Sequence, residues 1–154
     1  MVLLLREPHR FTREELCIAA EKAWSVSFAG SPGSNHFVMQ AGHVTFVKTG
    51  PHVLNLFHVS GPYLDDPEEI SKGFPPGSSR EAWAKHRAWA AVDYLKGGRK
   101  IDLEYAVIAK LVAEMLDSNC TGVYIPGENV FLPNDPSLRG ELQNIAANDL
   151  DTPN

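Results

Sequence analysis

The chain has 154 residues, a formal net charge of −5 at pH 7 and a hydrophobic content of 44%. This length is typical of one globular domain, and it is large enough to bury a core without disulfides or metals. The acidic balance argues against a general nucleic-acid partner, because phosphate binding needs a basic surface.

Cysteine usage and hydropathy predict the compartment. Cys17 and Cys120 lie far apart and fit no metal spacing, so we interpret them as small buried apolar residues in a reducing compartment. Segment 1–6 is too short for the apolar region of a signal peptide, and no run approaches the roughly 18 apolar residues of a membrane span. We therefore expect a cytoplasmic protein without membrane contact.

The first 60 residues predict one helix among strands. An apolar run at 2–5 is typical of a buried strand. Thr12 and Glu15 have the spacing of a capping box, followed by apolar residues at helical spacing, which predicts a helix over 13–24. Segments 36–40, 43–48 and 52–59 are rich in β-branched and aromatic residues and are separated by glycine turns. They predict an antiparallel meander.

The second half predicts mainly helices. Segment 60–78 is rich in proline and glycine and predicts a long loop. Ser78 and Glu81 again have capping-box spacing, which predicts a helix from 79 to Leu95 that stops at Gly97-Gly98. A second helix over 102–117, capped by Asp102, would form a helical hairpin with it. A strand is expected over 121–125, and a last helix after Asp135 and Pro136.

The order of these elements predicts the fold class. Strands are concentrated at 36–59 and helices at 79–117, which favours an α+β fold over a doubly wound α/β fold. We expect a single domain over 1–147, with a mainly antiparallel sheet and helices packed on one face. The polar tail, 148–154, is expected to fray.

One stretch of the predicted helix 79–95 mixes polar and aromatic residues. At helical spacing one side carries Trp83, His86, Trp89 and Asp93, and the opposite side carries Arg80 and Arg87. Polar groups among aromatics must be hydrogen-bonded or functional. Either His86 and Asp93 fix loops and strand ends, or the four residues line a ligand pocket covered by the 60–78 loop.

No catalytic residue, metal site or cofactor is predicted. His86 and Asp93 are two helical turns apart, about 10 Å, and cannot chelate one ion. The other histidines have no ligand spacing within one element, although His36 and His43 flank a hairpin and could approach each other across strands. The glycine-rich segment 29–35 lacks the patterns of phosphate and dinucleotide loops, and no nucleophile elbow exists.

Several motifs resemble a known family. They are His86-Arg-Ala-Trp-Ala-Ala-Val-Asp93, Ile108-Ala-Lys-Leu-Val-Ala-Glu-Met-Leu116, Gly122-Val-Tyr-Ile-Pro126 and Gly61-Pro-Tyr63. In this order, over roughly 37–142, the chain resembles an uncharacterised bacterial family of unknown function. The resemblance implies a compact bacterial α+β domain and assigns no activity and no site residue. Some proteins of this general kind occur near toxin–immunity systems.

The function expected from these observations is non-enzymatic. The lack of catalytic, cofactor and metal motifs favours a cytoplasmic binding protein of the adaptor or immunity type, with a protein partner. The alternative is a small enzyme or small-ligand-binding protein whose pocket lies at the Trp83, His86, Trp89 and Asp93 face. The partner, any ligand and the oligomeric state stay open.

Overall fold

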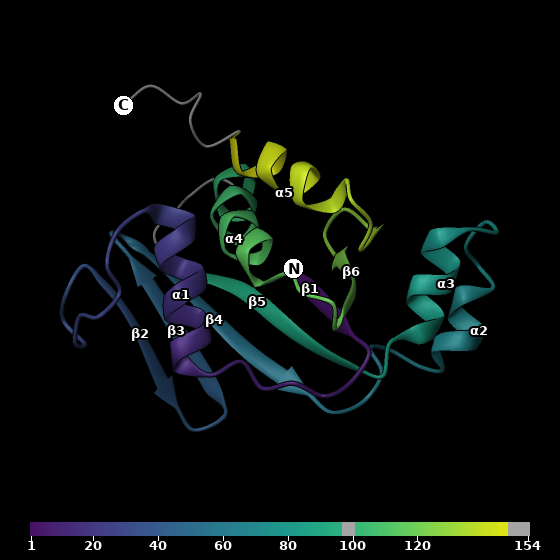
Figure 1. The fold of residues 1–154 in the computed structure, drawn as a ribbon, viewed down its shortest axis with the longest axis horizontal. Helices are drawn as coiled ribbons and strands as arrows, with labels where there is room; N and C mark the ends of the chain where they lie inside the picture. The colour runs from purple at the N-terminus through teal and green to yellow at the C-terminus, as the bar shows by residue number, and fades with distance from the viewer. Residues whose placement is uncertain (97–100, 148–154) are drawn as a thin grey trace.

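A computed structural model describes residues 1–96 and 101–147. Its seven strands form one antiparallel sheet in the order β2-β3-β4-β5-β1-β6-β7 (Figure 1). The strands are β1 (Val2–Leu5), β2 (His36–Ala41), β3 (Val44–Thr49), β4 (His52–Val59), β5 (Ala88–Lys96), β6 (Cys120–Ile125) and β7 (Val130–Pro133). The helices are α1 (Arg13–Trp24), α2 (Pro67–Ser71), α3 (Ser78–Lys85), α4 (Ile101–Met115) and α5 (Leu138–Ala147).

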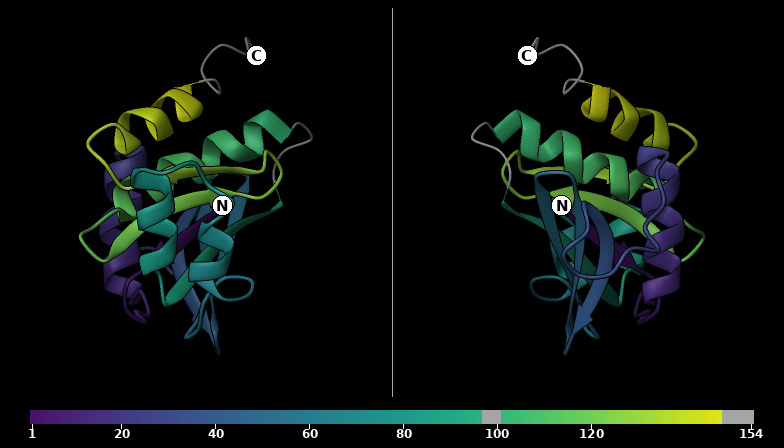
Figure 2. Two further views of the ribbon diagram at one scale, coloured as in Figure 1. Left: turned by 90° about the vertical axis from the view of Figure 1, so that its right-hand side faces the viewer. Right: turned by 90° about the vertical axis from the view of Figure 1, so that its left-hand side faces the viewer.

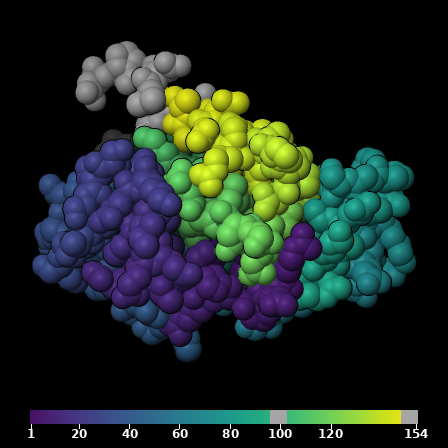
Figure 3. All heavy atoms as spheres, in the orientation of Figure 1, coloured from purple at the N-terminus to yellow at the C-terminus, as the bar shows by residue number. Residues whose placement is uncertain are grey.

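The predicted class, an α+β fold with a mainly antiparallel sheet and helices packed against it, is confirmed. The three long helices α1, α4 and α5 cover one face, which Figure 3 shows as a continuous surface of their side chains. The short helices α2 and α3 pack against the other face, near β6 and β7. Among the described residues no helix is long and apolar enough to cross a bilayer.

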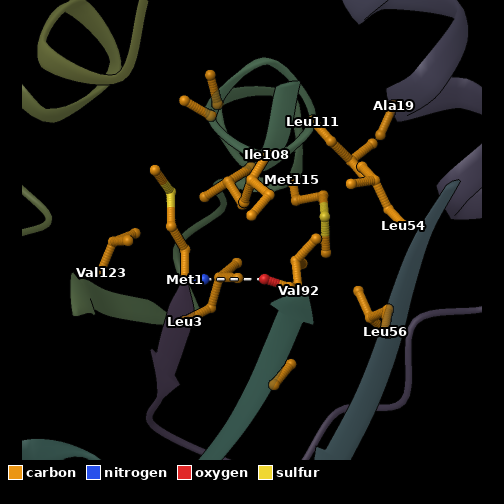
Figure 4. Packing of buried hydrophobic residues seen from close by; sticks show 14 of the residues in the cluster. Met1, Leu3, Ala19, Leu54, Leu56, Val92, Ile108, Leu111, Met115 and Val123 are labelled. Atoms are coloured by element: carbon orange, nitrogen blue, oxygen red, sulfur yellow. Dashed lines mark hydrogen bonds between the residues drawn. The ribbon is translucent and has the colours of Figure 1, made fainter. Parts of the chain in front are cut away.

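The main core lies between the sheet and the long helices. Leu3, Leu54 and Val92 from three strands meet Ile108 and Leu111 of α4 (Figure 4). All five are less than 5% exposed. The backbone nitrogen of Met1 donates to the carbonyl of Val92 at 2.8 Å and extends the pairing of β1 with β5. The centre of the sheet is therefore fixed to α4 by both packing and hydrogen bonds.

The first half of the chain folds as predicted. The helix over 13–24 is confirmed together with its capping box: Thr12 Oγ1 accepts from the Glu15 amide, and the Glu15 carboxylate accepts from the Thr12 amide. The meander is confirmed as β2, β3 and β4. Its turns contain Gly42 and Gly50, whose φ values of 62° and 54° favour glycine.

The predicted helix 79–95 is wrong beyond Lys85. The chain becomes extended at His86, and Ala88–Lys96 forms β5, between β4 and β1. The physical reason is β1, a fully buried strand whose backbone groups need partners on both edges. Residues 88–96 pair with one edge of β1 and satisfy its backbone groups there. In this extended conformation their side chains alternate between the two faces of the sheet.

Other expectations fail with that helix. The helical hairpin does not exist, because a strand precedes α4, and Asp102 lies inside α4 rather than at its cap. The Ser78 and Glu81 capping box does not form, since Gly77 precedes α3 without a side-chain cap hydrogen bond. The predicted 60–78 loop contains α2, and β7 was not predicted. The Gly97-Gly98 stop and the 148–154 tail lie outside the described residues.

Replacing Gly122 with alanine is expected to destabilise the β6–β7 pair by about 2 kcal/mol. A Cβ atom at Gly122 would lie 2.4 Å from Phe131 Cζ and 2.6 Å from the carbonyl oxygen of Leu132. The second contact is with backbone and cannot be relieved by a rotamer change. The matched control is Gly140→Ala in α5, where nothing lies within 4 Å. Urea unfolding of the two variants should give opposite signs, since alanine favours a helix by up to about 1 kcal/mol.

Candidate functional site

The structure buries His86 at the end of α3 and uses both of its ring nitrogens. The side chain is 0% exposed. Its Nε2 accepts from the Tyr63 amide at 3.0 Å, so the proton sits on Nδ1, which donates to the Trp83 carbonyl at 2.5 Å. Burial lowers the pKa of His86 and keeps the ring neutral. These contacts favour the structural interpretation of His86 over the ligand-binding one.

Trp83 lies in an aromatic cluster that fixes α2 and α3 to the sheet. It is 2% exposed and makes ring contacts with Tyr63, Phe74, Tyr124 and Phe131 at centroid distances of 5.1 to 6.4 Å. Its Nε1 is buried and has no hydrogen-bond partner among the described residues. Aromatic rings fill the surroundings of the indole, so the cluster is a second small core.

Trp89 and Asp93 lie on β5 rather than on the helix. Both point to the sheet face opposite α1, because they alternate with the core residues Ala90 and Val92. Trp89 is half-buried and contacts the rings of Phe57 and Tyr63 at 5.6 and 5.2 Å, whereas Asp93 is exposed. The prediction that one side of a single helix carries all four residues is therefore wrong.

Beyond Phe57 and Trp89, which pack against the aromatic cluster of α2 and α3, this face continues over β3 and β2. Alternation with core residues of β2, β3 and β4 places Met39, Phe46 and Phe57 on it, and all three are half-buried. Figure 2 shows α1 on one side of these strands, and the short helices α2 and α3 pack on the other face near β6 and β7. We call this surface the open half-face: Met39, Val44, Phe46, Lys48, Val53, Asn55, Phe57, Val59, Trp89 and Asp93.

Polar groups interrupt the open half-face at its centre. Asn55 pairs with Phe46 on one side and with Asp93 on the other. The Asn55 Oδ1 atom is buried and has no hydrogen-bond partner among the described residues. A buried acceptor without a donor costs free energy. Asn55 therefore lowers the free energy of unfolding, and no hydrogen bond of its Oδ1 atom within the described residues compensates for this cost.

A second site, which the sequence did not predict, lies on the helix side of the sheet. A pocket of about 380 Å³ is lined by His9, Arg10, His43, His58 and Ser60, with Pro8 and Val59. We call it the histidine pocket. Its walls come from the segment before α1, the β2–β3 turn and the end of β4. In Figure 3 the N-terminal segment, in purple, meets the blue residues of the β2–β3 turn at the lower edge.

Hydrogen bonds fix the walls of the histidine pocket. His58 Nε2 accepts from the Phe11 amide at 3.1 Å, and the two rings stack. Burial, followed by Arg10 and His9, lowers the pKa of His58 to about 4. Arg10 Nη2 donates to the Gly42 carbonyl at 2.7 Å, which ties the segment before α1 to the β2–β3 turn.

Strand register explains why the sequence missed this pocket. The register that pairs Thr45 with Leu56, continued by two residues, places His43 beside His58. The sequence had indicated only that His36 and His43 could approach each other across the hairpin. That expectation is wrong, because His36 lies opposite Thr49 at the far end of the hairpin. The missing signal was the register of β3 with β4, which hydrophobic alternation alone leaves open.

Metal and thiol chemistry have little support in the described part of the chain. No group of three His, Cys, Asp or Glu side chains there is arranged to hold an ion. Both cysteines are free thiols. Cys120 is buried, as expected, and burial raises its pKa to about 12, while Cys17 is only half-buried. A protonated, buried thiol is a poor nucleophile.

The four residues predicted as one site thus divide into a buried pair and a pair on the open half-face. Trp83 and His86 hold α2 and α3 in place, and Trp89 and Asp93 face outward. Neither pair has a geometry that identifies a reaction. In comparisons with known proteins, no family model, no curated protein and no solved structure matches this chain.

Proposed function

We propose that the protein is a non-enzymatic binding protein, of the adaptor or immunity type, that contacts a protein partner through the open half-face. The observation that carries the proposal is the contrast between the two faces of the sheet. One face packs against α1, α4 and α5. On the other face α2 and α3 lie near β6 and β7, with Phe57 and Trp89 packed against their aromatic cluster, and Phe46 on β3 stays half-buried beyond it. Aromatic residues on an uncovered surface are typical of protein interfaces.

The alternative, an enzyme or small-ligand pocket at Trp83, His86, Trp89 and Asp93, has weaker support. His86 has no exposed surface and its nitrogens are occupied by backbone groups. Reaction at His86 would require opening the aromatic cluster around it. The resemblance to an uncharacterised bacterial family stays a prediction and transfers no residue role.

Charge at the rim indicates the chemistry of the partner. The segment after β4, which follows the exposed Val59 and contains the exposed Leu64, carries four exposed acidic residues: Asp65, Asp66, Glu68 and Glu69. Of these, Glu69 pairs with Lys72 at 2.5 Å. Asp93 adds a carboxylate on the face itself. The surface therefore suits a partner with an apolar patch flanked by lysine or arginine.

Selection from a displayed peptide library tests this proposal. We expect enriched peptides to combine aromatic or aliphatic residues with Lys and Arg. Phe46→Lys should weaken their binding at least tenfold, which corresponds to about 1.4 kcal/mol, because it removes a central apolar contact and repels basic groups. The matched control is Ile18→Lys on α1, which is 54% exposed on the opposite side.

The readouts separate binding from folding. Val59→Lys, at a site already 39% exposed, provides a second variant if Phe46→Lys loses its fold. Amide shifts of labelled protein should change along β2 to β5 on peptide addition. Enrichment of acidic peptides, or equal binding by the wild type and both face variants, would refute the proposal.

A further inference from the structure

We propose that the histidine pocket binds a phosphate group, free or as the monoester of a small molecule. The open half-face does not account for this pocket, because His58 stacks on Phe11 at the helix side of the sheet. A volume of about 380 Å³ lies within the range of small-ligand sites. The pocket shares Val59 with the open half-face, so the two proposals are tested with different variants.

Donors from three separate segments line the pocket. Since His58 Nε2 already accepts from the Phe11 amide, its neutral ring carries a proton on Nδ1. Within the described residues no protein group accepts from that nitrogen. Arg10, His43 and the Ser60 hydroxyl add further donors. Several residues with N–H and O–H donors line this one cavity, a composition that suits an oxyanion with several acceptor oxygens.

The charges around the pocket favour an anion over a cation. The one carboxylate among the charged neighbours of His58 belongs to Glu15. That carboxylate accepts from the Thr12 amide at 2.7 Å and lies 3.1 Å from His9 Nε2, so its charge is already engaged. Arg10 instead donates to a neutral oxygen, the Gly42 carbonyl.

The guanidinium charge of Arg10 is therefore not neutralised by any carboxylate of the described chain. In a protein of net charge −5 this is a local positive site in a concave setting. Arginine binds phosphate through two parallel N–H donors, a geometry that a lysine does not reproduce. The hydrogen bond to the β2–β3 turn holds that group at the pocket in advance of ligand binding.

A titration followed by amide shifts and calorimetry tests the site. The probes are inorganic phosphate and glycerol 3-phosphate, with chloride at matched ionic strength. We expect saturable shifts at Phe11, Gly42 and Ser60 with phosphate, and tighter binding of the monoester if the pocket receives an organic group. Equal affinity for both probes would assign the site to free phosphate.

Variants identify the residues responsible. Arg10→Gln should weaken phosphate binding at least tenfold, and Arg10→Lys should retain only part of the affinity. Lys85→Gln is the control, since it removes the same charge from an exposed pair with Glu81. If Arg10→Gln loses its fold by thermal melting, His43→Ala in the exposed turn replaces it. Shifts that do not saturate, or that persist equally in the Arg10 and His43 variants, would overturn the assignment.

Discussion

Replacing His86 with alanine is expected to lower the free energy of unfolding by about 3 kcal/mol. The Tyr63 amide would lose its only described acceptor, while the Trp83 carbonyl would keep the His86 backbone amide at 3.3 Å. One orphaned donor and the cavity left by a fully buried ring both contribute. For a domain of this size, thermal melting should show a drop of roughly 6–12 °C.

A graded series shows whether the hydrogen bonds cause the effect. In His86→Gln the amide oxygen can accept from the Tyr63 amide but cannot also reproduce the Nδ1 bond to Trp83. The stability order should therefore be wild type, glutamine, alanine. His43→Ala, in an exposed turn, is the control and should change stability by less than about 0.5 kcal/mol. A melting temperature for His86→Ala that equals the wild type would disprove the structural role.

The parts of the fold with local signals were predictable. The capping box at Thr12 and Glu15 identified the start of α1, because its two reciprocal hydrogen bonds involve residues three apart. Glycine turns between alternating segments identified β2 to β4. In each case the stabilising interactions lie within a few residues of the signal.

The strand β5 was not predictable from its own residues. Its sequence, Ala88-Trp-Ala-Ala-Val-Asp-Tyr-Leu-Lys96, is compatible with a helix, and a spacing of four places Trp89 and Asp93 on one side of either element. Pairing with β1, more than 80 residues earlier in the chain, decides the conformation. The helix error therefore came from a long-range contact that no local window contains.

The sequence predicts more of the Trp83 and His86 pair than of the histidine pocket. Trp83 and His86 were identified as unusual because polar and aromatic residues lie close together in the chain. The partner of His86 is the Tyr63 amide, a backbone group that no side-chain pattern indicates. The histidine pocket joins residues 9, 10, 43 and 58. The register of β3 with β4 brings His43 beside His58, and long-range hydrogen bonds to His58 and Gly42 bring in the segment before α1.

Acidification from pH 7 to pH 4 is expected to destabilise the protein, mainly through histidines that are neutral when folded. Burial lowers the pKa of both His58 and His86 below the ordinary value of 6.5. Below pH 6.5 the unfolded chain therefore binds protons that the folded chain excludes, and stability falls with pH. For His58 the loss continues down to about pH 4, where the folded ring also takes up its proton.

Other titratable groups change the stability mainly at pH values outside the range in which the two histidines titrate. The pKa of Asp135 is lowered by its hydrogen bonds to Ser137, so its contribution is lost only as the pH falls below 3.8. The Met1 amine, whose pKa is lowered from 8.0 by burial, acts in the same direction as the histidines but from a higher pH. Each histidine contributes at most about 1.4 kcal/mol per pH unit, and His58 contributes less because its ring is partly solvent-exposed.

Urea unfolding at pH 7, 6, 5 and 4.5, in buffers free of phosphate, measures this dependence. His58→Gln is the informative variant, because its amide oxygen can accept from the Phe11 amide and does not titrate. Its stability should fall less steeply between pH 6.5 and 4.5 than that of the wild type. His43→Ala, in the exposed turn, should keep the wild-type slope. If the wild type and His58→Gln lose stability in parallel, the folded ring of His58 is not held neutral, and burial does not set its charge.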